Sequence, residues 1–235
     1  MVAALKARGM YENTLIFFSS DNGGVTSARF AHGAGQEGKG AAEKPPASNG
    51  AFRGGKGSLY EGALRVPAFV HFPARLAPAV VNEPLHHVDV MPTLLALAGA
   101  QAKPAKPLDG QDMWPTLAGG RPSPHDVLPL HIEQLRAAVR QGKWKLILTV
   151  LLPGKVELYD LEADPGESKN VAAEHPDVAK ALEARLREIA RTQQMSRFLL
   201  TQSDFFGVQG ETQLAPELDE DAGSSGEKPV LPEGR

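Results

Sequence analysis

The amino-acid sequence predicts an α/β fold followed by a small α+β subdomain with an antiparallel sheet. Three observations predict it. Residues 13–20 are apolar on both faces, which is typical of a strand inside a central parallel or mixed sheet with flanking helices. Residues 88–99 read as a short helix beside that sheet. Residues 143–161 read as an antiparallel hairpin, and an amphipathic helix follows it.

The α/β part begins with the last turns of a helix over residues 3–8. The first apolar strand follows, and residues 66–72 form a second one. Between these strands, residues 25–57 are rich in Gly, Ala, Lys and Pro and show no period of 2 or 3.6, so they predict a long loop. Loops longer than about 12 to 15 residues are usually functional or disordered. Gly99 suits the carboxy-terminal end of the helix predicted over residues 88–99.

The subdomain is predicted from two strands and one helix. Residues 143–150 and 156–161 flank a Pro153-Gly154 turn and predict the hairpin. After Pro176, apolar residues recur at helical spacing and can cover one face of the hairpin: Val178, Leu182, Leu186 and Ile189. We therefore expect an α/β region over residues 1–120 and an antiparallel subdomain over 121–200.

Charge is unevenly distributed along the 235 residues. The net charge is −3, but residues 210–235 hold seven acids against two bases and so carry −5. This composition supplies little to bury, and residues 201–235 are predicted to be a disordered acidic tail. The absence of a basic excess argues against a nucleic-acid partner.

Other features exclude further classes of protein. No run reaches the roughly 18 to 20 apolar residues of a membrane span. There is no Cys, so the chain has no disulfide, no thiolate metal site and no cysteine nucleophile. The segment after Met1 is too short and too charged for a signal peptide, and localisation is not predicted.

Asp21 and Asn22 directly follow the first apolar strand and precede two glycines. A carboxylate and an amide oxygen at a strand end suit a hard cation such as Ca²⁺ or Mg²⁺. Asp-Asn-Gly-Gly is also a common turn sequence, and that structural interpretation stays open at this point.

Lys56 lies between glycines in residues 53–57. Glycines allow close approach of the backbone to an anion, and an ammonium group neutralises a sulfate or phosphate ester. The spacing is not that of a nucleotide phosphate-binding loop, because Gly57 follows the lysine where Ser or Thr is required. A solvated lysine in a flexible loop is the alternative.

The order of these motifs resembles that of the arylsulfatase-like type I sulfatases. In that family a strand ends in Ser-Asp-Asn-Gly, and a Gly-Lys-x-x-x-Tyr-Glu-Gly block and an Asp-x-x-Pro-Thr-Leu helix follow. Leu-Asp-Gly, Arg-x-Gly-x-Trp-Lys and Glu-Leu-Tyr-Asp-Leu segments come later. The matching segments in this chain are residues 20–23, 55–67, 89–94, 108–110, 140–145 and 157–170.

The resemblance implies a partial alkaline-phosphatase-like sandwich and hydrolysis of sulfate esters, either aryl or carbohydrate sulfates. It implies that Asp21 and Asn22 are two ligands of an active-site Ca²⁺ and that Lys56 binds a sulfate oxygen. The family's nucleophile is a formylglycine, made from the first residue of a Cys/Ser-x-Pro-x-Arg motif. That motif is absent here.

By this resemblance the chain is the carboxy-terminal half of a sulfatase, and its partner would be the missing amino-terminal half. Alone it is predicted to be inactive. Full-length relatives are periplasmic, secreted or lysosomal. Two alternatives remain open: a phosphodiesterase or phosphonate hydrolase of the same superfamily, and a non-catalytic module that binds a sulfated glycan or a protein.

Overall fold

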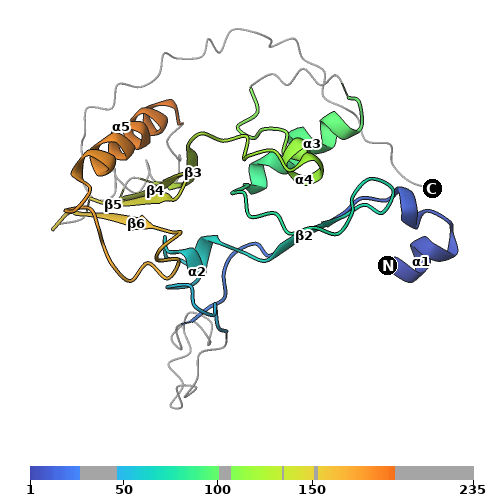
Figure 1. Cartoon of the computed structure of the whole chain (residues 1–235), viewed down its shortest axis with the longest axis horizontal. Coiled ribbons are helices and arrows are strands. Elements are labelled where there is room, and N and C mark those ends of the chain that lie inside the picture. Colours follow the sequence, from blue (N-terminus) through green and yellow to red (C-terminus); the bar gives the residue numbers. More distant parts are fainter. Residues whose placement is uncertain (27–46, 101–106, 134, 151–152, 194–235) are drawn as a thin grey trace, which may run out of the picture. The chain divides into compact units, whose positions relative to one another are not determined.

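The computed structural model describes residues 1–26, 47–100, 107–133, 135–150 and 153–193 (Figure 1). Residues 1–192 cluster into one compact unit. The predicted tail and most of the predicted long loop lie outside the described residues. The predicted boundary at residue 120 is tested by nothing in this structure and stays a prediction. Among the described helices, none combines the length and the apolar character that a membrane crossing requires.

The first sheet has two described strands, β1 (Ile16–Ser19) and β2 (Ala68–His71). They pair antiparallel with Phe18 opposite Phe69, and the two rings stack with their centroids 5.1 Å apart. The sequence predicted β1 as a buried strand in a parallel or mixed sheet. Instead, Phe18 is 50% exposed, and no parallel neighbour is present among the described residues. An apolar run fixes neither the direction of its partner nor what covers it.

Residues of two short helices, α3 (Val90–Leu97) and α4 (Trp114–Gly119), line a small pocket together with residues of β1 and β2. The predicted first helix is α1 (Val2–Ala7), and the predicted helix over 88–99 is a 3-10 turn, η3 (His87–Asp89), continued by α3. Gly99 follows α3 with a φ of 64°, the left-handed conformation expected after a helix end. The sequence analysis did not identify the helix α4.

The carboxy-terminal sheet has four antiparallel strands in the order β3-β4-β5-β6. The predicted hairpin is confirmed as β5 (Trp144–Thr149) and β6 (Lys155–Asp160), with Leu146 opposite Leu158. The sequence analysis did not identify the other two strands, β3 (Leu128–Ile132) and β4 (Arg136–Gln141).

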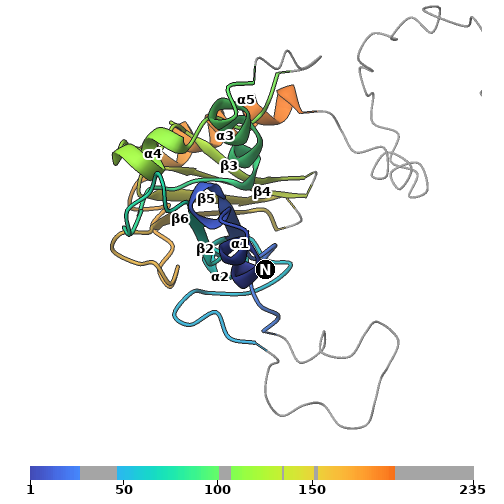
Figure 2. The same cartoon turned by 90° about the vertical axis from the view of Figure 1, so that its right-hand side faces the viewer.

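The two faces of this sheet pack against different parts of the chain (Figures 1 and 2). The predicted amphipathic helix, α5 (Pro176–Thr192), covers one face and buries Leu182 and Leu186 against it. Full burial of a leucine side chain stabilises a fold by about 1.5 to 3 kcal/mol. On the other face, Ile147 and Tyr159 pack against Leu59, which lies two residues before the start of α2 (Glu61–Leu64). The segment around Lys56 therefore leads into a helix that lies on the subdomain sheet.

Candidate functional site

The Asp21-Asn22 turn leaves β1 with its backbone held by local hydrogen bonds. The Asn22 N–H donates to Asp21 Oδ1 at 2.9 Å, and the Ser20 hydroxyl donates to the Asn22 carbonyl at 2.9 Å. The Asn22 side-chain amide donates to the Gly23 carbonyl at 2.9 Å. Among the described residues, no hydrogen bond reaches Asp21 Oδ2 or Asn22 Oδ1, and Asp21 is exposed.

The turn lies directly beside the loop that carries Lys56. The Lys56 N–H donates to the Gly24 carbonyl at 3.2 Å. The Asn49 side chain reinforces this contact, because its oxygen accepts from the Gly24 N–H at 2.8 Å and its amide donates to the Gly54 carbonyl at 2.9 Å. Two motifs far apart in sequence thus meet, and the Lys56 side chain itself is exposed.

Glycines make this close approach possible. The Gly23 N–H donates to the Ala63 carbonyl at 2.9 Å, and a Cβ on Gly23 would lie 1.7 Å from the Gly62 oxygen. A Cβ on Gly62 would lie 2.4 Å from the Gly54 oxygen. Ala63 is not strained, since its φ is not positive.

A buried ion triad lies under the start of α2. The Lys145 ammonium on β5 is 2.9 Å from Glu61 Oε1 and 2.8 Å from Glu167 Oε1. Glu167 Oε2 also accepts the Glu61 N–H at 2.6 Å. The side chains of Lys145 and Glu167 are 0% exposed. Burial raises the pKa of the Glu167 carboxyl, although the Lys145 ammonium acts in the opposite direction.

A second set of contacts joins Arg53 to the same sheet. Its guanidinium donates to the Tyr159 hydroxyl at 3.0 Å and to the Glu167 carbonyl at 2.8 Å. It also lies 3.8 Å from the centroid of the Tyr60 ring, which is cation–π geometry. The Tyr159 hydroxyl donates to Glu157 Oε1 at 2.6 Å. Arg53 thereby attaches the loop before Lys56 to β6.

The acid–base properties of this set follow from its contacts. Burial and the hydrogen bond to Glu157 raise the pKa of the Tyr159 hydroxyl, so this group stays protonated. Burial also acts to raise the pKa of Glu157. Hydrogen bonds from Lys155, Tyr159 and Tyr60 outweigh it, and the pKa of Glu157 lies below its ordinary value. Glu157 is therefore a charged anchor and not a proton donor at neutral pH.

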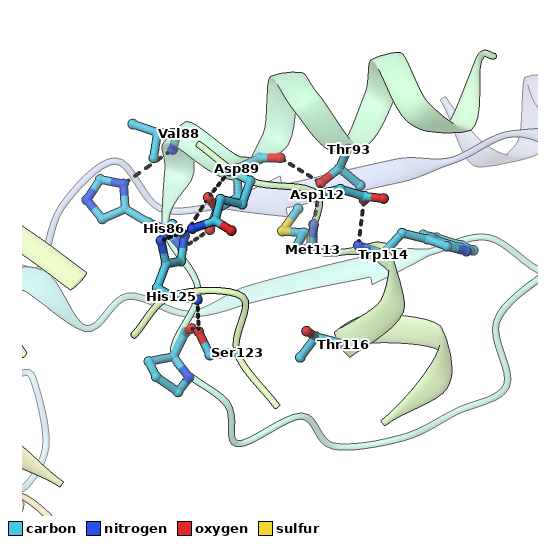
Figure 3. Close-up of polar contacts among 12 residues, drawn as sticks. His86, Val88, Asp89, Thr93, Asp112, Met113, Trp114, Thr116, Ser123 and His125 are labelled. Atoms are coloured by element: carbon cyan, nitrogen blue, oxygen red, sulfur yellow. Dashed lines mark hydrogen bonds and ion pairs between the residues drawn. The ribbon is translucent and has the colours of Figure 1, made fainter. Parts of the chain in front are cut away.

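A separate polar cluster surrounds Asp89 (Figure 3). Asp89 is 0% exposed and accepts from the backbone N–H groups of His86 and Gln111 at 2.8 and 3.0 Å. His125 Nε2 lies 2.7 Å from Asp89 Oδ1. The Thr93 hydroxyl donates to the Asp89 carbonyl at 2.6 Å. Both carboxylate oxygens have protein partners, so this cluster ties η3 and α3 to later segments and offers no open site.

Asp21 and Asn22 are the candidate ligands for a hard cation among the described residues. Asp21 and Asn22 supply oxygen donors of the kind that Ca²⁺ binds, but Ca²⁺ takes about 6 to 8 oxygen ligands. Across the described ranges, no group of three or more His, Cys, Asp or Glu residues is placed to hold a metal. The donor chemistry therefore fits Ca²⁺, whereas the number of ligands is too small for tight binding by these residues alone.

Sequence reasoning identified Asp21, Asn22 and Lys56 as candidates but missed the residues that hold them. Asn49 lies in a segment with no recognisable pattern. Lys145 did give a signal, because it occupies a position on β5 whose next neighbour on the same face is the apolar Ile147. A lysine on an otherwise apolar strand face predicts a buried anionic partner, because a buried charge is unfavourable unless it is paired.

Comparisons with known proteins agree on one family. The sequence pattern of the sulfatases matches residues 1–100, and that of the family described as N-sulphoglucosamine sulphohydrolase, C-terminal, matches residues 52–192. The chain belongs to the sulfatase family. The chain is 35% identical over 213 residues to human arylsulfatase A. The matched region covers 77% of this chain and 39% of that relative. The chain spans well under half the length of the curated relatives that it matches.

Solved structures support the same fold. This sulfatase chain resembles Ps i-CgsB in complex with k-i-k-neocarrahexaose at a TM-score of 0.67 and 27% identity, over 88% of this chain and 44% of that one. It also resembles the phosphonate monoester hydrolase of Agrobacterium radiobacter at a TM-score of 0.55 and 25% identity, over 80% and 38%. The α/β fold class predicted from the sequence is consistent with these likenesses.

Proposed function

We propose that this chain is the carboxy-terminal part of a sulfatase that hydrolyses sulfate esters. One observation carries the proposal: the hydrogen bond from the Lys56 N–H to the Gly24 carbonyl, which joins the two candidate motifs. The match of residues 52–192 to a carboxy-terminal sulfatase family and the partial coverage of longer relatives support it.

Lys56 is proposed to bind a sulfate oxygen. Its ammonium group carries three donors and a full charge, and its loop is held by backbone contacts while the side chain is exposed. Such a group can neutralise an ester in the ground state and the charge that develops on its oxygens during hydrolysis. Gly55, which precedes Lys56, lets the loop pack closely against the turn, because a Cβ there would lie 2.4 Å from the Gly24 oxygen.

Asp21 and Asn22 are proposed to be two ligands of a Ca²⁺ ion. Asp21 Oδ2 and Asn22 Oδ1 are the oxygens left free by the hydrogen bonds within the turn. A bound Ca²⁺ would supply positive charge that polarises the ester. The chain's own contribution is to orient these two oxygens beside the Lys56 loop, while further ligands come from outside the described residues.

The nucleophile is proposed to lie in an upstream segment. The chain contains neither Cys nor a Ser-x-Pro-x-Arg motif, so it has no residue from which a formylglycine could form. The exposed pair of Phe18 and Phe69 on the two-stranded sheet fits a surface that other strands cover in the complete protein. We expect the chain alone to show no sulfatase activity.

The proposed substrate is a sulfated carbohydrate or an aryl sulfate. The structural likeness to Ps i-CgsB in complex with k-i-k-neocarrahexaose supports a sulfated carbohydrate. The sequence similarity to arylsulfatase A supports an aryl sulfate. A phosphonate hydrolase is the alternative, and its support is the structural likeness to the Agrobacterium enzyme. Both matching family patterns describe sulfatases, which is why the sulfate ester is preferred.

The experiment begins with the DNA upstream of the Met1 codon. An in-frame Cys/Ser-x-Pro-x-Arg motif is expected, and the protein produced with that segment should hydrolyse 4-nitrophenyl sulfate. Lys56→Ala should lower its kcat/KM by at least about tenfold, as expected for loss of a charge-stabilising group. A protein that hydrolyses 4-nitrophenyl phenylphosphonate faster than the sulfate would favour the alternative. A chain that binds sulfated glycans with no such motif upstream would instead indicate a non-catalytic module.

A further inference from the structure

The loop that carries Lys56 is attached at both ends to the carboxy-terminal sheet. Before Lys56, the Arg53 guanidinium donates to the Glu167 carbonyl and to the Tyr159 hydroxyl. After Lys56, the Gly57 carbonyl accepts from Arg136 at 2.8 Å. Each of these contacts joins residues at least 79 positions apart. The position of the loop is therefore set by a distant part of the chain.

The ion triad completes this attachment. Glu61 begins α2 five residues after Lys56, and its carboxylate pairs with Lys145. Glu167 pairs with the same ammonium and accepts the N–H of Glu61, so it fixes both the side chain and the backbone at the start of α2. With the Arg53 contact to its carbonyl, Glu167 contacts the segment on both sides of Lys56.

Burying the three charges of the ion triad is energetically unfavourable. A buried ion pair often contributes no more stability than an apolar replacement, because desolvation offsets the Coulomb attraction. Two carboxylates share one ammonium here, which leaves the triad with a formal charge of −1 when Glu61 and Glu167 are both ionised. Glu167 also has a φ of 53°, a left-handed conformation that is unfavourable for a non-glycine residue. Such a triad is a poor source of stability but can specify a single geometry.

We propose that Lys145 and Glu167 are positioning residues for Lys56. They fix the start of α2 and the loop before it, so that the carboxy-terminal sheet sets where the Lys56 backbone meets the Asp21-Asn22 turn. This inference rests on the proposed role of Lys56 in sulfate binding. It assigns the carboxy-terminal sheet and Glu167 a part in building the site.

The test compares the unaltered chain with the neutral triple variant Glu61→Gln/Lys145→Met/Glu167→Gln. This variant removes every charge of the triad and keeps an acceptor for the N–H of residue 61. The matched control is Lys169→Met/Glu174→Gln, which removes an exposed ion pair from the connection between β6 and α5. Global stability is measured by urea unfolding. Residue-resolved hydrogen exchange at low protein concentration then follows the Lys56 amide, with the Leu182 amide in α5 as the internal reference.

The triple variant should exchange the Lys56 amide at least about tenfold faster, because the bond to Gly24 opens locally, while Leu182 keeps its rate. The control should leave both rates unchanged. A folded triple variant with an unchanged Lys56 amide would overturn the proposal, since the triad would then serve packing alone. If the triple variant does not fold, Glu167→Gln is measured in the same way, with a smaller increase expected and the same outcome overturning it.

A second readout separates this inference from the proposed function. Exposed lysines are acetylated with and without inorganic sulfate, and Lys180 on α5 serves as the exposed reference. In the unaltered chain sulfate should protect Lys56 more than Lys180, and in the triple variant this difference should disappear. Equal protection in the unaltered chain would contradict sulfate binding by Lys56, while the amide exchange would still decide whether Lys145 and Glu167 position the loop.

Discussion

Gly23 lies against the carbonyl group of Gly62, and a Cβ atom on Gly23 would lie only 1.7 Å from that oxygen. The Gly23 N–H donates at 2.9 Å to the carbonyl of Ala63, the residue after Gly62. The turn that carries Asp21 is therefore held against α2 by a contact that no larger residue allows. This relationship links the candidate metal ligands to the helix that rests on the carboxy-terminal sheet.

Gly23→Ala is expected to lower the free energy of unfolding by about 1 to 3 kcal/mol, because the clash is with backbone and cannot be relieved by rotating a side chain. Urea unfolding measures the change. Gly119→Ala is the control, since nothing lies within 4 Å of its Cβ position and its φ is not positive. That substitution should be neutral or stabilise by up to about 1 kcal/mol. Equal effects of the two substitutions would contradict the close contact.

Asp89→Ala is expected to lower the free energy of unfolding by at least about 2 kcal/mol, because it leaves two backbone N–H groups and His125 without their acceptor. Thermal or urea unfolding measures the loss. Asp112→Ala removes a carboxylate that, within the described part of the chain, accepts a single hydrogen bond, from the Trp114 N–H, and it should lower the free energy of unfolding by about 1 kcal/mol. A smaller loss for Asp89 than for Asp112 would show that the Asp89 cluster is less important than its burial suggests.

Stability should depend on pH with opposite signs at Glu167 and Glu174. Burial raises the folded-state pKa of Glu167, so the folded chain holds its proton to higher pH than the unfolded chain. The stability of the unaltered chain relative to Glu167→Gln should therefore fall as pH rises above the ordinary carboxyl pKa, about 4.3, and then level off.

The hydrogen bond from Lys169 lowers the pKa of Glu174. Stability relative to Glu174→Gln should be fully present above the ordinary pKa and be lost as pH falls through the lowered value. Urea unfolding from about pH 3 to 8 measures both differences. Curves of the same sign for the two variants would contradict the buried state of Glu167.

The exposed pair of Phe18 and Phe69 should promote self-association of the chain when it is produced alone. Phe18→Ser/Phe69→Ser is expected to lower the average mass measured by light scattering at equal protein concentration. Val80→Ser is the control, because Val80 is 86% exposed and is not part of the stacked pair of Phe18 and Phe69. If the unaltered chain is a monomer, the proposal that other strands cover this surface loses its support.

The candidate site was predicted in part. Asp21, Asn22 and Lys56 follow from motif order, and the structure places the turn and the loop side by side. The residues that hold the turn and the loop in place could not be predicted. Asn49 lies in no recognisable sequence pattern, and Glu167 contacts the N–H of Glu61, which is 106 positions away in the sequence. Such contacts arise only when separate elements pack together.

Local chemistry alone determined several elements of this protein. Apolar periodicity specified the hairpin of β5 and β6 and the helix α5, and the ordered motifs identified the sulfatase family. Tertiary structure decided the rest. The antiparallel pairing of β1 and the burial of Lys145 depend on which surfaces meet, since the burial of a side chain is set by segments distant in sequence.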